Sequence, residues 1–210
     1  MKTACKIEKF VTGIISTNCY VVSNEETKEA VIVDPAACPP SILNYIKEEE
    51  LKVTAILLTH GHFDHTMGIG GFLEKFPVPV YVHEKEEDTL KDPALNLSGI
   101  YTAGFTFSDV TYIRDNQVLS LAGYDFLVLH TPGHTPGGVC YYVEKEKVLF
   151  SGDTLFQGSV GRTDFPNSSM SDLVRGIREK IFTLPDDVKV YPGHMGETMI
   201  GYEREHNPFV

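Results

Sequence analysis

The sequence is short of the features that mark exported and membrane proteins. No apolar run reaches the roughly 18 residues that a membrane-spanning helix needs. The first ten residues carry early lysines but no apolar stretch behind them, so we do not expect a secretory signal. The cysteines Cys5, Cys19, Cys38 and Cys140 are scattered, without a Cys-x-x-Cys pair, and we interpret them as reduced thiols of a cytoplasmic protein.

Basic residues are also scarce. The chain has 18 Lys and Arg against 29 Asp and Glu, a net charge of −11 at pH 7. Binding to nucleic acids depends on neutralising phosphates with Lys and Arg, so we expect neither a nucleic-acid partner nor a membrane partner. Repeats, low-complexity segments and Gly/Ser linkers are absent as well. We therefore predict a single domain over residues 1–210.

Short β-branched and aromatic runs, bounded by Gly, Pro, Asn or Asp, predict strands. They lie at residues 19–22, 30–33, 55–58, 80–82, 126–129, 139–143, 148–150 and 188–191. Apolar spacing predicts helices at 41–50, 66–76 and 169–182, the last with a capping box formed by Ser169 and Asp172. Residues 84–109 show no clear period, which is typical of a functional or disordered excursion. The order of elements predicts an α/β protein with layered sheets covered by helices.

One segment, between an apolar run and a predicted helix, is rich in metal-binding side chains. It reads Thr59-His60-Gly61-His62-Phe63-Asp64-His65. Because alternate residues of an extended chain point the same way, His60 and His62 share one side. Asp64 and His65 come where the chain turns into the helix and approach from another side. Imidazole suits zinc and a carboxylate adds a harder ligand, so this cluster is predicted to serve two adjacent ions.

Three later residues complete the set, each in a loop directly after a predicted strand. They are His134 in Thr-Pro-Gly-His-Thr-Pro-Gly, Asp153 in Ser-Gly-Asp-Thr, and His194 in Tyr-Pro-Gly-His. A rigid scaffold presents side chains well from such positions.

These blocks resemble the metallo-β-lactamase superfamily along nearly the whole chain. The resemblance implies an αβ/βα sandwich with two central mixed β-sheets flanked by helices. It implies that the ligands of a first metal ion are His60, His62 and His134. It implies that Asp64, His65 and His194 hold a second ion, with Asp153 bridging the two. Asp34, in Val-Ile-Val-Asp-Pro, matches the aspartate that supports the metal loop, although a turn-forming residue before proline explains it equally well.

Within the superfamily, the stretch 152–164 and the ending after His194 resemble the glyoxalase II-like, hydroxyacylglutathione hydrolase-like branch of short bacterial thioesterases. Full-length glyoxalase II has a further C-terminal helical domain, whereas this chain ends 16 residues (210 − 194) after His194. Authentic β-lactamases are disfavoured, because they lack the bridging aspartate and are exported. Anionic thioesters need a local positive charge, for which Arg162 is the candidate; the alternative is an arginine ion-paired with Asp164 or Asp109.

The resemblance thus implies an enzyme that hydrolyses S-lactoylglutathione or a related small-molecule thioester through a metal-bridging hydroxide. Asp153 and Asp64 would be its catalytic carboxylates, Asp64 orienting the nucleophile. Two divalent ions are expected, with zinc favoured and iron or manganese as alternatives. Two other interpretations remain: a persulfide dioxygenase of the same fold with one iron, and a non-catalytic metal-binding or redox-partner protein.

Overall fold

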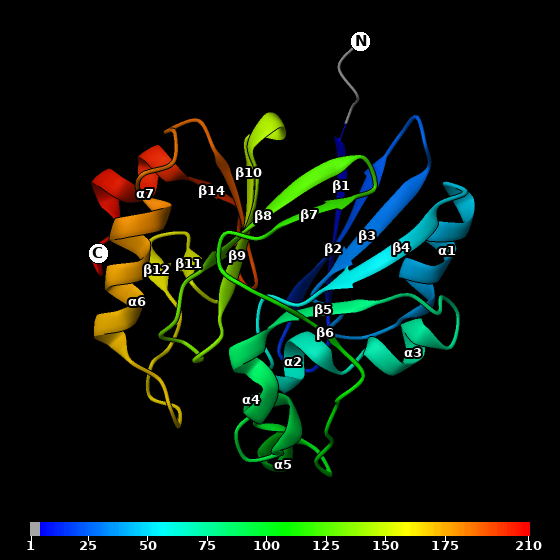
Figure 1. The fold of residues 1–210 in the computed structure, drawn as a ribbon, viewed down its shortest axis with the longest axis horizontal. Coiled ribbons are helices and arrows are strands. Elements are labelled where there is room, and N and C mark those ends of the chain that lie inside the picture. The colour runs from blue at the N-terminus through cyan, green and yellow to red at the C-terminus, as the bar shows by residue number, and fades with distance from the viewer. Residues whose placement is uncertain (1–4) are drawn as a thin grey trace.

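Two mixed β-sheets face one another and carry helices on their outer faces (Figure 1). The computed structural model describes residues 5–210, so part of the expected non-signal segment 1–10 lies outside the described residues. The first sheet has the order β1 (Cys5–Thr12), β2 (Thr17–Asn24), β3 (Glu29–Val33), β4 (Lys52–Leu57), β5 (Val80–His83) and β6 (Thr111–Ile113). The second has the order β14 (Thr198–Met199), β13 (Lys189–Pro192), β10 (Val148–Gly152), β9 (Val139–Val143), β8 (Tyr124–His130) and β7 (Val118–Leu121).

Each sheet combines antiparallel and parallel neighbours. In the first, β1, β2 and β3 run antiparallel, and β3 to β6 run parallel. In the second, β10 and β13 are the parallel pair. A small hairpin of β11 (Leu155–Phe156) and β12 (Ser159–Val160) stands beside the second sheet.

The helices cover the outer faces and the loop ends of the sheets. They are α1 (Pro40–Glu48), α2 (Phe63–Thr66), α3 (Ile69–Leu73), α4 (Glu87–Lys91), α5 (Ser98–Tyr101), α6 (Met170–Gly176) and α7 (Ile200–His206). Short 3-10 turns occupy Glu84–Glu86 and Glu144–Glu146, and a π-helical turn at Ile177–Ile181 extends α6. None of these helices in the described part of the chain is long and apolar enough to cross a membrane.

Three apolar clusters hold the layers together. The central one lies between the sheets and includes Tyr20, Phe126, Tyr141 and Phe150, all buried. The second packs α1 and α3 on the first sheet, and the third packs α6 and α7 on the other. Burial of apolar surface is the main favourable term in folding. The packed sandwich is therefore a rigid scaffold for the loops at its edge.

The structure confirms all eight predicted strands and corrects one helix. The predicted helix 66–76 is two short helices, α2 and α3, and the first begins earlier, at Phe63. The break comes at Gly68, whose amide donates to the Pro35 carbonyl at 2.8 Å. That bond takes the place of one within a helix, and a Cβ at this position would lie too close to the backbone of Pro35 and Ala37, so the residue is glycine. Half of the predicted capping box of α6 is present, because Ser169 Oγ accepts from the Asp172 amide at 3.3 Å, whereas the Ser169 amide donates to the Gly133 carbonyl at 2.7 Å.

Candidate metal centre

The metal-binding side chains predicted from the sequence meet at one end of the sandwich. His60 and His62 lie in the extended segment between β4 and α2, and His62 is the N-cap of α2. Asp64 and His65 occupy the first turn of that helix and are buried. The parallel strand β4 thus delivers the whole cluster to its carboxyl end, where helix α2 begins.

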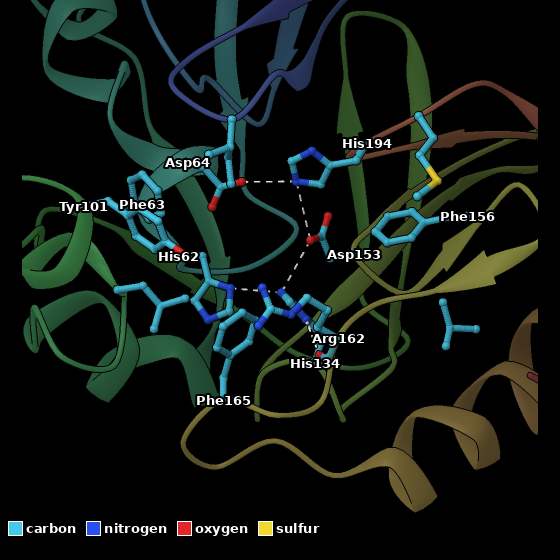
Figure 2. Close-up of a pocket in the computed structure, with 14 residues that line it drawn as sticks. His62, Phe63, Asp64, Tyr101, His134, Asp153, Phe156, Arg162, Phe165 and His194 are labelled. Atoms are coloured by element: carbon cyan, nitrogen blue, oxygen red, sulfur yellow. Dashed lines mark hydrogen bonds and ion pairs between the residues drawn. The ribbon is translucent and has the colours of Figure 1, made fainter.

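The second sheet contributes the remaining three residues. His134 follows β8, Asp153 follows β10 and His194 follows β13. Figure 2 shows them converging with Asp64 and His62 around one point. Three groups have potential ligand atoms within 4.8 Å of one another: His60 with His62 and His134; His60 with His65 and Asp153; and Asp64 with His65 and His194. The structure therefore brings together all seven residues that the resemblance implies.

Asp34 orients two of the histidines from behind. It accepts from the Thr59 amide at 2.8 Å, from Thr59 Oγ1 at 2.7 Å, and from His65 Nδ1 at 2.9 Å. Since the Thr59 hydroxyl proton is given to Asp34, the hydroxyl oxygen can accept from His60 Nδ1, 3.2 Å away. Both histidines then carry their protons on Nδ1, which leaves each Nε2 free to bind a cation.

His134 is held in the same way by a backbone carbonyl. Its Nδ1 donates to the carbonyl oxygen of Arg162 at 2.7 Å, and its Nε2 faces His62 Nδ1 at 2.9 Å (Figure 2). Burial, and then the neighbouring His134, lower the pKa of His62 to about 3. Burial also lowers the pKa of His60 and of His134. Neutral imidazoles are the form that metal ions bind.

Carboxylates surround the other half of the centre. Asp64 Oδ2 accepts from Thr17 Oγ1 at 3.0 Å and lies 3.2 Å from His194 Nε2. Asp153 lies 3.3 Å from His65 Nε2 and 3.6 Å from His194 Nε2. Residue 193 is glycine because a Cβ there would overlap the Asp153 carboxylate and the His65 ring.

These residues fit divalent cations. Within the described chain, His60 Nε2, His65 Nε2 and Asp153 Oδ1 are buried without a hydrogen-bond partner, although burying an unsatisfied polar atom is costly. Burial by itself would lower the pKa of His65, but the charges of Asp64 and Asp34 outweigh this and raise it well above its usual value. The carboxylates thus favour positive charge beside His65 Nε2, and a metal ion bound there would supply that charge in place of a proton.

The hydrogen bonds of the Arg162 guanidinium go to an aspartate outside the predicted ligand set. The guanidinium donates to both carboxylate oxygens of Asp164, at 3.0 and 2.8 Å. It also stacks on the Phe165 ring, 4.5 Å from the ring centroid. Of the two interpretations left open by the sequence, substrate recognition and an ion pair, the structure has the ion pair, and its partner is Asp164 and not Asp109. The backbone carbonyl of Arg162, which sequence reasoning did not single out, is the part that touches a ligand.

Glu86 is a supporting residue that the sequence did not reveal. It is fully buried, and its two oxygens accept from the amides of Gly61 and Gly137, each at 2.7 Å. Burial raises the pKa of this carboxyl to about 7, against the lowering effect of its hydrogen bonds. One side chain thereby ties the loop of His60 and His62 to the loop of His134. It lies in the segment 84–109, which the structure shows to be ordered around α4 and α5.

A cavity of about 240 Å³ opens above the centre (Figure 2). Five of the predicted ligands line its floor: His62, Asp64, His134, Asp153 and His194. Most other lining residues are apolar and come from segments far apart in the chain, including Ile15, Leu97, Tyr101 and Phe156. A substrate in this cavity would touch the ligands directly.

Comparisons with known proteins agree with this geometry. The model of the family described as the metallo-beta-lactamase superfamily matches residues 12–194. The chain is 38% identical over 210 residues to the probable metallo-hydrolase M6_Spy0554 of Streptococcus pyogenes, covering 97% of this chain and 90% of that protein. It is 36% identical over 208 residues to the hydroxyacylglutathione hydrolase GloC of Haemophilus influenzae, covering 97% of each.

Solved structures show the same arrangement of the chain. The structure described as BLEG-1 B3 metallo-beta-lactamase is 43% identical, with a TM-score of 0.91 over 97% of this chain and 99% of that one. A di-iron-bound form of TTHA1623 is 33% identical, with a TM-score of 0.86 over 97% of this chain and 100% of that one. The predicted fold, two mixed sheets flanked by helices, is confirmed.

Proposed function

Because the chain belongs to the metallo-β-lactamase superfamily, we propose that it is a dinuclear metal-dependent hydrolase that cleaves small-molecule thioesters, S-lactoylglutathione or a related one. The observation that supports this most is the convergence of seven His and Asp side chains, five of which line the floor of an open cavity. His60, His62 and His134 would hold one ion. Asp64, His65 and His194 would hold the other, with Asp153 between them.

Divalent ions at these positions would lower the pKa of a coordinated water to about 7 and stabilise negative charge on a carbonyl oxygen. The chain's own residues set the geometry for this chemistry. Burial alone would raise the pKa of Asp64, but the charge of His65 and the hydrogen bond from His194 lower it well below its usual range. Asp64 therefore stays a carboxylate and can accept a hydrogen bond from a water above the floor.

A thioester suits a site with these residues. The leaving thiol has a pKa near 8.5, so it can depart as a thiolate without a dedicated proton donor. Among the described residues that line the cavity, the titratable groups besides the predicted ligands are Tyr101 and Arg162, and a thiolate leaving group needs a proton from neither.

The test is anaerobic release of free thiol from S-lactoylglutathione and from simpler thioesters, by protein loaded separately with Zn²⁺, Fe²⁺ or Mn²⁺. We expect turnover that disappears with a chelator and returns with the metal. Oxygen uptake with a persulfide, without thiol release from any thioester, would contradict the proposal and favour a dioxygenase.

Hydrolysis of β-lactams, which the sequence features disfavoured, is a second candidate. It is favoured by the 43% identity and the TM-score of 0.91 to the structure described as a B3 metallo-beta-lactamase. The same loaded protein should be assayed with a cephalosporin and a penicillin beside the thioesters. Ring opening at a rate equal to or above thioester cleavage would favour this candidate over the first.

A further inference from the structure

The cavity above the metal centre has apolar walls. Apart from the ligands on its floor and Arg162, its lining consists of Phe63, Leu97, Tyr101, Phe156, Val160, Phe165, Ile15 and Met195. Phe63 and Tyr101 stack with their ring centroids 4.9 Å apart, which gives one wall a flat aromatic surface. Figure 2 shows Phe156 and Phe165 on other sides of the same space.

Apart from the metal ions that the proposed function places on the floor, the lining offers an anionic substrate little positive charge. Within the described part of the chain, Arg162 is the one Lys or Arg that lines the cavity, and two of its guanidinium nitrogens, Nε and Nη2, donate to Asp164. One face of the guanidinium lies over the Phe165 ring. The chain as a whole carries a net charge of −11, which repels anions further.

The rim of the cavity is apolar too. Ile15, Tyr101 and Met195 are 42%, 47% and 58% exposed although each lines the opening. They come from the β1–β2 turn, from α5 and from the loop after β13. Exposed apolar side chains gathered around a cavity mark a surface that meets an apolar ligand.

We propose that this cavity selects thioesters whose acyl group is short, apolar and uncharged, in preference to thioesters of anionic thiols such as glutathione. The inference rests on the proposed thioesterase function and names its substrate class. A volume of about 240 Å³ is below the roughly 300–1,000 Å³ of pockets that enclose drug-sized ligands, so the cavity encloses the acyl part, and the thiol part would lie at its opening. Water adds to the acyl carbon, the C–S bond breaks, the thiol leaves with the bonding electron pair, and the acid and thiol share the protons of that water.

The first experiment measures kcat/KM for acetyl, propanoyl and butanoyl thioesters of N-acetylcysteamine, a neutral thiol, beside S-lactoylglutathione. Burial of each CH₂ should raise kcat/KM about fourfold, so the butanoyl ester should exceed the acetyl ester by roughly 15-fold. S-Lactoylglutathione should be slower than the butanoyl ester. A flat series, or S-lactoylglutathione as the fastest substrate, would overturn the proposed class while leaving the thioesterase function intact.

Two neighbouring isoleucines provide a matched pair of variants. Ile15 lines the cavity, whereas Ile14, 56% exposed in the same turn, does not. Ile15→Ser should reduce kcat/KM for the butanoyl ester about fivefold and flatten the dependence on chain length. Ile14→Ser should behave as the wild type. Equal effects of the two substitutions would contradict the assignment of this wall.

Binding separates failure of the substrate class from failure of the function. Non-hydrolysable S-ethyl and S-butyl thioethers of N-acetylcysteamine are titrated into the protein by calorimetry. The S-butyl compound should bind more tightly, with a more negative heat-capacity change, because it buries more apolar surface. If no thioester is hydrolysed, the proposed function fails, and this titration still decides whether the cavity takes an apolar chain. Equal affinities would overturn the inference.

Discussion

Substituting Asp34 with asparagine should reverse the tautomers of two predicted metal ligands, His60 and His65, without disturbing the fold. Asparagine tolerates the left-handed backbone at this position, where φ is 51°. Its amide oxygen must face the Thr59 amide, because the opposite orientation would set two donors against each other. The NH₂ group then replaces Oδ2, and it donates to Thr59 Oγ1 and to His65 Nδ1.

Both changes turn protons toward the centre. With Nδ1 accepting, neutral His65 carries its proton on Nε2, the atom that faces Asp64 and Asp153. The Thr59 hydroxyl proton is released from position 34 and can be given to His60 Nδ1, which moves the His60 proton to Nε2 as well. Loss of an orienting partner typically weakens metal affinity 10–100-fold, so we expect a loss of that order, about 1.4–2.8 kcal/mol, for each ion.

Two measurements check this prediction. Competition with a chromogenic chelator gives the affinity of each ion, and ¹⁵N NMR of labelled histidines reports the tautomers directly. Asp115→Asn is the control, since Asp115 also accepts from a backbone amide, that of His130 at 2.9 Å, but touches no predicted ligand. Wild-type affinity for both ions in Asp34→Asn, with Nδ1 still protonated, would refute the reasoning.

Three further predictions concern other parts of the centre. Asp153→Ala should bind fewer than two ions by elemental analysis and lose most turnover while keeping its circular dichroism spectrum; two bound ions with full turnover would count against it. Burial raises the pKa of Glu86 in the folded chain to about 7, above its ordinary 4.5, so its contribution to stability is lost as pH rises from about 4.5 through 7. In urea unfolding, the free energy of unfolding of the wild type should fall by up to about 3 kcal/mol relative to that of Glu86→Gln over this window. Parallel dependence of the two free energies on pH would disprove this. Arg162→Ala, which keeps the backbone carbonyl, should lower kcat/KM by the same factor for charged and neutral thioesters. A rise in KM for charged thioesters alone would restore a role for Arg162 in substrate recognition.

Most of the predicted metal centre could be identified from local sequence. The spacing of His60, His62 and His65 after an apolar run is enough to place them, because a strand followed by a helix has few local conformations. The same holds for β9 (Val139–Val143), which was predicted with its observed bounds. These features depend on neighbours in the chain.

The features that were missed depend on distant parts of the chain. Strand β1 (Cys5–Thr12) has half-buried residues of mixed polarity, and pairing with β2 defines it more than its own pattern does. Glu86 looks like a surface residue in a run of charges, and only its contacts with Gly61 and Gly137 explain its burial. The cavity walls likewise come from turns and short helices whose positions follow from packing of the whole sandwich.

The predicted ligands come from both halves of the molecule, and this links folding to the supply of metal. His60, His62, Asp64 and His65 follow a strand of one sheet, whereas His134, Asp153 and His194 follow strands of the other. An ion shared across that boundary binds the folded chain and not the separated halves, so by mass action each tenfold rise in free metal above its dissociation constant adds about 1.4 kcal/mol to the free energy of unfolding. Resistance of the protein to heat and proteolysis should therefore follow the free metal concentration of its surroundings.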